Sequence, residues 1–153
     1  MQQIDIKNLK KTLFITLIVG LTFTSCKQNE VDGILIGSTL CENQSFSDNR
    51  QLRQLIHQTL GMDKKALAEL SKFRCGGGAG CYDLGFIVTQ IIYRIGAKEF
   101  ATMLENLTSE ETNLIEGLIM VGLEYGDNDK DGEMDDKRIE NEFPELQKRL
   151  RSK

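Results

Sequence analysis

The apolar residues between positions 84 and 95 recur at helical spacing and constrain this chain more than any other feature. Steps of three or four residues separate Leu84, Ile87, Val88, Ile91, Ile92 and Ile95. This spacing places them on one face of an α-helix. Phe86 and Tyr93 widen the apolar stripe, and Gly96 is typical of a helix end. The pattern predicts a central, buried helix that other segments must cover.

Weaker stripes of the same period precede this helix. Asp48 can cap a first helix, which Gly61 ends, and a second helix starts near Asp63. The glycine-rich run between Cys75 and Cys81 interrupts the pattern before the central helix begins. The first half of the domain is therefore expected to be two short helices and a loop.

Similar signals follow the central helix. After a short fourth helix, Thr108 and Glu111 have the spacing of a capping box and open a fifth helix. Pro144 interrupts the last stripe and predicts two short helices there, because proline lacks an amide hydrogen. We expect an all-α fold, a single compact bundle of five or six short helices over residues 48–153.

Residues 1–26 have the layout of a secretory signal. Lys7, Lys10 and Lys11 precede a mostly apolar stretch, residues 13–23, and small residues then lead to the cysteine. The stretch is too short for a membrane-spanning helix, which needs about 20 residues. The segment Phe23-Thr24-Ser25-Cys26 resembles the lipobox of bacterial lipoproteins, although Phe23 stands where leucine is usual.

The resemblance implies a signal peptide over residues 1–25 and a Cys26 that carries fatty acyl chains such as palmitate. Two or more chains give a stable membrane anchor. Residues 26–47 would then be a tether and an irregular segment, in which residues 34–36 are either a short strand or an extended stretch against the core. The expected location is the cell envelope, on the periplasmic side or the cell surface. An ordinary cleaved signal and a membrane-buried N-terminal helix are the alternatives.

The chain after Cys26 is acidic. Residues 27–153 hold 16 of the 19 basic residues and 22 of the 23 acidic residues, a net charge of −6. This balance argues against nucleic acid as a partner, because nucleic-acid binding needs a basic face. Residues 127–136 alone carry a net charge of −5, so the acidity is concentrated in one segment.

This acidic segment opens with a motif. Residues 127–132 match D-x-D-x-D-G and resemble the start of an EF-hand calcium loop. Calcium takes about six to eight oxygen ligands, and alternate side chains in a tight turn can aim carboxylates at one point. The resemblance implies calcium as a cofactor, Met134 as the loop's apolar anchor, and these ligands: Asp127, Asp129, Asp131, the carbonyl of Glu133, and Asp135 directly or through water.

The motif is incomplete. Arg138 stands at the twelfth position, where an EF-hand has a bidentate glutamate, so Glu140 or Glu142 would have to replace it in a longer loop. The alternative is a solvated acidic turn between two helices. Closely spaced carboxylates repel one another without a cation, which favours the metal site. We expect a bound calcium ion to fix the angle between the fifth helix and the C-terminal helices.

Three cysteines follow Cys26. An exported protein meets an oxidising compartment, so a disulfide is expected. Cys75 and Cys81 are the nearest pair and would pin the second helix to the start of the third. A bridge from Cys41 to either of them would instead tie the N-terminal segment to the core. We favour Cys75–Cys81.

The chain has no nucleophile elbow, zinc motif or dinucleotide motif. We therefore expect a membrane-anchored, non-catalytic protein-binding module, with a protein partner of unknown identity. An immunity-type inhibitor of a periplasmic toxin is one alternative. A small cell-envelope hydrolase is another, with catalytic acids among Asp83, Glu99, Glu105, Glu110 and Glu111. A dyad of His57 with the remaining thiol needs a coincidence in space, so His57 is expected on the polar edge of the first helix.

Overall fold

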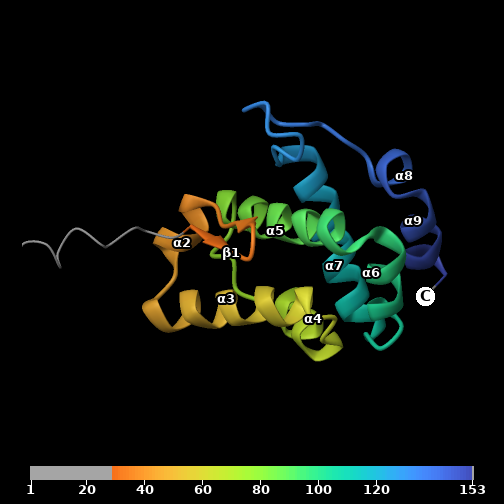
Figure 1. Cartoon of the computed structure of the whole chain (residues 1–153), viewed down its shortest axis with the longest axis horizontal. Helices are drawn as coiled ribbons and strands as arrows, with labels where there is room; N and C mark the ends of the chain where they lie inside the picture. The colour runs from red at the N-terminus through yellow and green to blue at the C-terminus, as the bar shows by residue number, and fades with distance from the viewer. Residues whose placement is uncertain (1–28, 153) are drawn as a thin grey trace, which may run out of the picture.

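The computed structural model describes residues 29–152 (Figure 1). These residues form eight helices and one two-stranded hairpin, so the expected all-α class is confirmed. The predicted signal peptide and Cys26 lie outside the described residues. None of the helices in the described part is long and apolar enough to cross a membrane.

The described chain begins with a hairpin. Strand β1 (Glu30–Val31) pairs antiparallel with β2 (Ile34–Leu35) across a tight Asp-Gly turn. Ile34 is buried in the core. The side chain of Gln90 bonds to the backbone of Leu35, accepting from its amide at 2.8 Å and donating to its carbonyl at 3.0 Å. Of the two readings of residues 34–36, the short strand is confirmed for residues 34 and 35.

The next helix was not expected from the sequence. Helix α2 (Ser38–Asn43) occupies part of the segment taken as irregular. Its N-terminus has no local side-chain cap. The carboxylate of Asp83, from a later helix, accepts a hydrogen bond from the amide of Leu40 at 2.8 Å. A cap supplied by a residue 43 positions away leaves no local pattern in the sequence.

Helices α3 (Phe46–Leu60) and α4 (Lys64–Ser71) form the first expected pair. The predicted cap of α3 is wrong by three residues. Ser45 caps the helix, and Asp48 is the acidic partner that completes the capping box. Helix α4 begins beside Asp63, as expected, and the Asp63 side chain caps it.

Helices α5 (Ala79–Ile95) and α7 (Ser109–Tyr125) pack against each other at the centre of the molecule (Figure 1). The expected buried stripe on α5 is confirmed, because its members from residue 84 to residue 92 are at most 1% exposed. The two helices come closest where Gly85 faces Gly122. The other helices pack around this central pair.

The start of α7 is joined to the region after α4. Thr108 and Glu111 form the expected capping box, in which the Thr108 amide donates to Glu111 Oε2 at 2.8 Å. The other carboxylate oxygen of Glu111 lies 2.6 Å from the Lys72 ammonium. The hydrogen bond from Lys72, followed by that from the Thr108 amide, lowers the pKa of Glu111 to about 2.

Three short helices complete the bundle: α6 (Ala97–Leu104), α8 (Ile139–Glu142) and α9 (Pro144–Arg151). Pro144 is the first residue of α9, so the expected division of the C-terminal stripe is confirmed. Arg149 pairs with Glu105 at 2.5 Å and joins α9 to the end of α6. The described part has eight helices where five or six were expected. Helix α2 was missed, and the expected total was too low for the individual helices that the pattern predicted, which included both C-terminal ones.

Candidate functional site

The acidic loop lies between α7 and α8, and its second half returns along the end of α7. The amides of residues 135–137 donate to carbonyls in or just after the last turn of α7. These bonds are Asp135 N to Gly126 O at 3.1 Å, Asp136 N to Glu124 O at 3.1 Å, and Lys137 N to Leu123 O at 2.9 Å. The base of the loop is therefore fixed to the central helix.

The structure brings three of the predicted ligands together. Asp127, Asp129 and Asp131 each offer a carboxylate oxygen, and these oxygens lie within 4.8 Å of one another, a group that could hold a metal ion. Their other contacts are mostly backbone amides within the loop. Asp127 Oδ2 accepts from Gly132 N at 3.2 Å, Asp129 Oδ1 from Asp131 N at 3.3 Å, and Asp131 Oδ1 from Glu133 N at 2.9 Å.

One oxygen of this cluster is unsatisfied. Asp127 Oδ1 is buried and has no hydrogen-bond partner among the described residues. A buried carboxylate oxygen without a donor is costly, because it has lost its water and gained nothing in return. A cation bound to the cluster would satisfy it.

The other predicted side-chain ligand, Asp135, is engaged elsewhere. Its side chain is 2% exposed and lies 2.9 Å from the Lys137 ammonium, which is also 3.7 Å from Asp129. Burial raises the pKa of Asp135, but hydrogen bonds from Lys137 and Asn128 outweigh it, so the pKa is lowered. The hydrogen bond with Asp135 raises the pKa of Lys137. Asp135 is thus a buried anion paired within the loop.

Asn128, at the first unspecified position of the D-x-D-x-D-G motif, connects the loop to both central helices. Its side-chain amide donates to Asp135 Oδ2 at 2.7 Å and to the carbonyl of Gly122 at 2.9 Å. Its side-chain oxygen accepts from the hydroxyl of Thr89 at 2.8 Å. No residue in the motif signals this role, because Thr89 is 39 positions away.

The remaining residues considered for the loop lie outside the cluster of three aspartates. Met134 does not anchor the loop, since its side chain is 70% exposed. Arg138 pairs with Glu124 at 3.6 Å and Asp136 at 3.4 Å. Glu142 accepts from the Tyr93 hydroxyl at 2.7 Å, and Glu140 from Gln147 at 3.5 Å. Neither glutamate belongs to the group formed by the three aspartates.

The disulfide is the expected one. Cys75 and Cys81 are bonded, with their Cα atoms 4.8 Å apart. The bridge joins the segment after α4 to the first turn of α5. Cys41 lies outside the bridge, half-buried against the core, and its carbonyl accepts from the Asn49 side chain at 2.8 Å.

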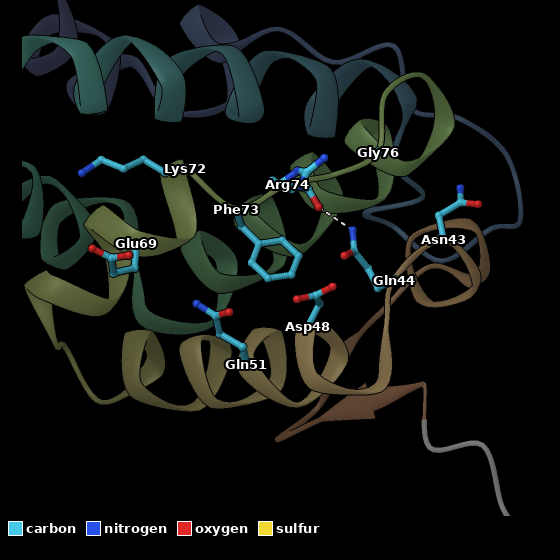
Figure 2. A pocket seen from close by; sticks show the side chains of 9 residues that line it. All are labelled: Asn43, Gln44, Asp48, Gln51, Glu69, Lys72, Phe73, Arg74 and Gly76. Carbon is cyan, nitrogen blue, oxygen red and sulfur yellow. Dashed lines mark hydrogen bonds between the residues drawn. The ribbon is translucent and has the colours of Figure 1, made fainter.

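A polar hollow of about 370 Å³ lies between α3 and the segment after α4 (Figure 2). Three of its polar side chains have structural roles. Asp48 caps α3, Lys72 pairs with Glu111, and Gln44 donates to the carbonyl of Arg74. These three side chains therefore serve the fold at the rim of the hollow.

The acids considered for a hydrolase come from α5, from α6 and the residue that follows it, and from α7. Asp83 caps α2, Glu105 pairs with Arg149, and Glu111 completes a capping box. His57 is exposed on α3, as expected, and its Nδ1 lies 2.6 Å from Asp32 Oδ2.

Comparison with protein families, with curated proteins and with solved structures finds no match to this chain.

Proposed function

We propose that this chain is an exported, non-catalytic protein-binding domain, anchored through Cys26 and stabilised by a calcium ion at Asp127, Asp129 and Asp131. The observation that carries the calcium site is the convergence of three carboxylates, one of which, that of Asp127, has a buried oxygen without a hydrogen-bond partner. The leader resemblance supports export and anchoring.

The donor set suits calcium. Calcium is a hard cation that binds carboxylate oxygens, backbone carbonyls and water in flexible geometry, whereas magnesium demands a near-ideal octahedron. Three aspartates leave room for backbone and water ligands. An extracytoplasmic location would expose the site to abundant calcium, so a weak site without the usual glutamate would still be filled.

Calcium would act on the fold rather than on a substrate. The three carboxylates repel one another, and a bound cation removes that repulsion. The loop that it closes holds residues 135–137 against the end of α7. We infer that calcium fixes the direction in which the chain leaves α7 toward α8 and α9.

Thermal unfolding of the wild-type protein in calcium and in chelator tests this site. Calcium at about 100 times its dissociation constant should stabilise the domain by about 2.7 kcal/mol, because it binds the folded state alone. Asp129→Asn should lose most of this shift, because it removes one of the three carboxylates. Asp129 is half-exposed, so the change should leave the fold intact. The control is Asp136→Asn, an exposed acid of the same loop outside the cluster. Equal melting of the wild type in calcium and chelator would refute the site.

The protein-binding surface that we propose adjoins this loop. Tyr82 on α5 and Tyr125 at the end of α7 stack with ring centroids 4.3 Å apart, and both are about 40% exposed. Met134 follows on the loop and is largely exposed. Exposed tyrosine and methionine side chains are typical of protein interfaces. The acidic residues around them favour a partner with a basic rim.

Affinity capture with the full-length protein, from envelopes solubilised in detergent, tests the binding surface. A stoichiometric protein partner should be retained by the wild type in calcium and lost by the double variant Tyr82→Ala/Tyr125→Ala. Leu114→Ala removes an equally exposed side chain elsewhere on α7 and should retain the partner. Equal capture by the tyrosine double variant would move the interface elsewhere, and equal capture in chelator would separate it from the loop.

A further inference from the structure

An exposed apolar residue lies at the end of the molecule where the described chain begins. Phe46, the first residue of α3, is 87% exposed, more than any other large apolar residue in the described part. It borders a hollow of about 450 Å³ whose lining also includes Asn29, Glu42, Arg50 and Arg53. In Figure 1, α2 and the start of α3 lie at this end, and the C-terminus lies at the opposite end.

The position at which the chain enters the fold is fixed. The carbonyl of Asn29 accepts a hydrogen bond from Ile36 N at 2.6 Å. The guanidinium of Arg53 donates to the carbonyl of Glu30 at 3.2 Å. The entry point is thus held by backbone bonds to the hairpin and by α3, and Asn29 itself lines the hollow beside Phe46.

The distance from this entry point to the proposed anchor is short. Cys26 is three residues before Asn29. Three residues span at most about 10 Å, whatever their conformation. A lipid-anchored Cys26 would therefore hold the hollow and Phe46 close to the headgroup layer of the bilayer, which is a few ångströms thick on each side.

We propose that Phe46, Arg50 and Arg53 form a membrane-contacting face that lies on the phospholipid surface. This inference rests on the proposed lipid anchor. Phe46 enters the boundary between headgroups and acyl chains, where an exposed aromatic side chain leaves water. The exposed guanidinium of Arg50 lies at the level of the lipid phosphates, which arginine binds through paired hydrogen bonds. Arg53 holds the carbonyl of Glu30 and contributes its positive charge to the face.

The charge of this end suits an anionic surface, and the short reach from Cys26 favours a bilayer over an acidic protein partner. The hollow is lined by two arginines and one glutamate, in a domain whose residues 27–153 carry a net charge of −6. An anionic bilayer attracts this end and repels the acidic loop. The face therefore sets the orientation of the domain, with the C-terminal helices directed away from the membrane.

A single tryptophan tests the face. The chain contains no tryptophan, so Phe46→Trp introduces one reporter into the full-length, acylated protein. It is reconstituted into vesicles of phosphatidylethanolamine and phosphatidylglycerol with brominated acyl chains, which quench tryptophan only on contact. We expect the emission to shift to shorter wavelength and to lose most of its intensity. Met134→Trp, also highly exposed, should keep the emission of a tryptophan in water.

Flotation of the same vesicles separates this proposal from the one on which it rests. Protein that fails to float overturns the anchor, and the membrane face with it. Protein that floats while Phe46→Trp remains unquenched leaves the anchor standing and overturns the face. A blue-shifted but unquenched emission would place Phe46 against protein instead and also overturn it. Quenching that persists in vesicles of zwitterionic lipid alone would retain the role of Phe46 and overturn the role given to the anionic charge of the surface.

Discussion

Gly122→Ala should lower the free energy of unfolding by about 3 kcal/mol, and the melting temperature by about 10 °C. A Cβ atom at position 122 would lie 2.1 Å from the carbonyl oxygen of Gly85, 2.4 Å from its carbonyl carbon, and 2.8 Å from the Thr89 methyl. The first two are backbone atoms, so no side-chain rotation relieves the clash. Helices α5 and α7 would have to separate, and the core packed around them would loosen.

Gly117→Ala is the matched control on the same helix. A Cβ atom there would meet nothing within 4 Å. Alanine is a better helix former than glycine by about 0.5–1 kcal/mol, so this variant should be slightly more stable than the wild type. Calorimetry of the two variants separates two effects of adding a methyl group to α7: the clash with α5 at position 122 and the gain in helix propensity at position 117. If Gly122→Ala melts at or above the wild-type temperature, α5 and α7 do not cross at this point.

The sequence could predict what depends on neighbours along the chain. The three- and four-residue spacing of Leu84 to Ile92 identified the buried face of α5, and the pair Thr108 and Glu111 identified the start of α7. Both signals arise within one or a few turns of helix. Helix α2 depends instead on Asp83, which caps it from 43 residues away. The crossing at Gly85 and Gly122 was missed for the same reason, since a glycine within a helical pattern does not say what approaches it.

The same distinction applies to the acidic loop, where the local spacing predicted some side-chain positions and contacts with α5 and α7 determine the others. Asp127, Asp129 and Asp131 converge because alternate residues of one tight turn face the same point, and the motif records that spacing. Asp135 was expected beside them. Its burial against Asn128 and Lys137 is set by how the loop packs on α5 and α7, which the motif does not encode. Met134 is exposed, and the side chain of Asn128 rather than an apolar residue joins the loop to α5 and α7.

Asn128→Ala should also cost about 3 kcal/mol of stability, although position 128 is unspecified in the D-x-D-x-D-G motif. The change removes three side-chain hydrogen bonds, to Asp135, to the Gly122 carbonyl and from Thr89. A bond to a charged group contributes about 1.5–3 kcal/mol and a neutral one about 0.5–1.5 kcal/mol. The Asp135 carboxylate is 2% exposed. It would keep the hydrogen bond from the backbone amide of residue 128 and the ion pair with Lys137, but it would lose the hydrogen bond from the Asn128 side chain.

The other unspecified position of the motif supplies the control. Lys130 is exposed, so Lys130→Ala should melt like the wild type. Urea unfolding of both variants in chelator separates the role of Asn128 from metal binding, because its side chain is no ligand of the proposed ion. The loss in Asn128→Ala should therefore persist without calcium. A variant that is as stable as the wild type in chelator, and weaker only in calcium, would contradict this account and show that the loop is attached to α5 and α7 through the ion rather than through Asn128.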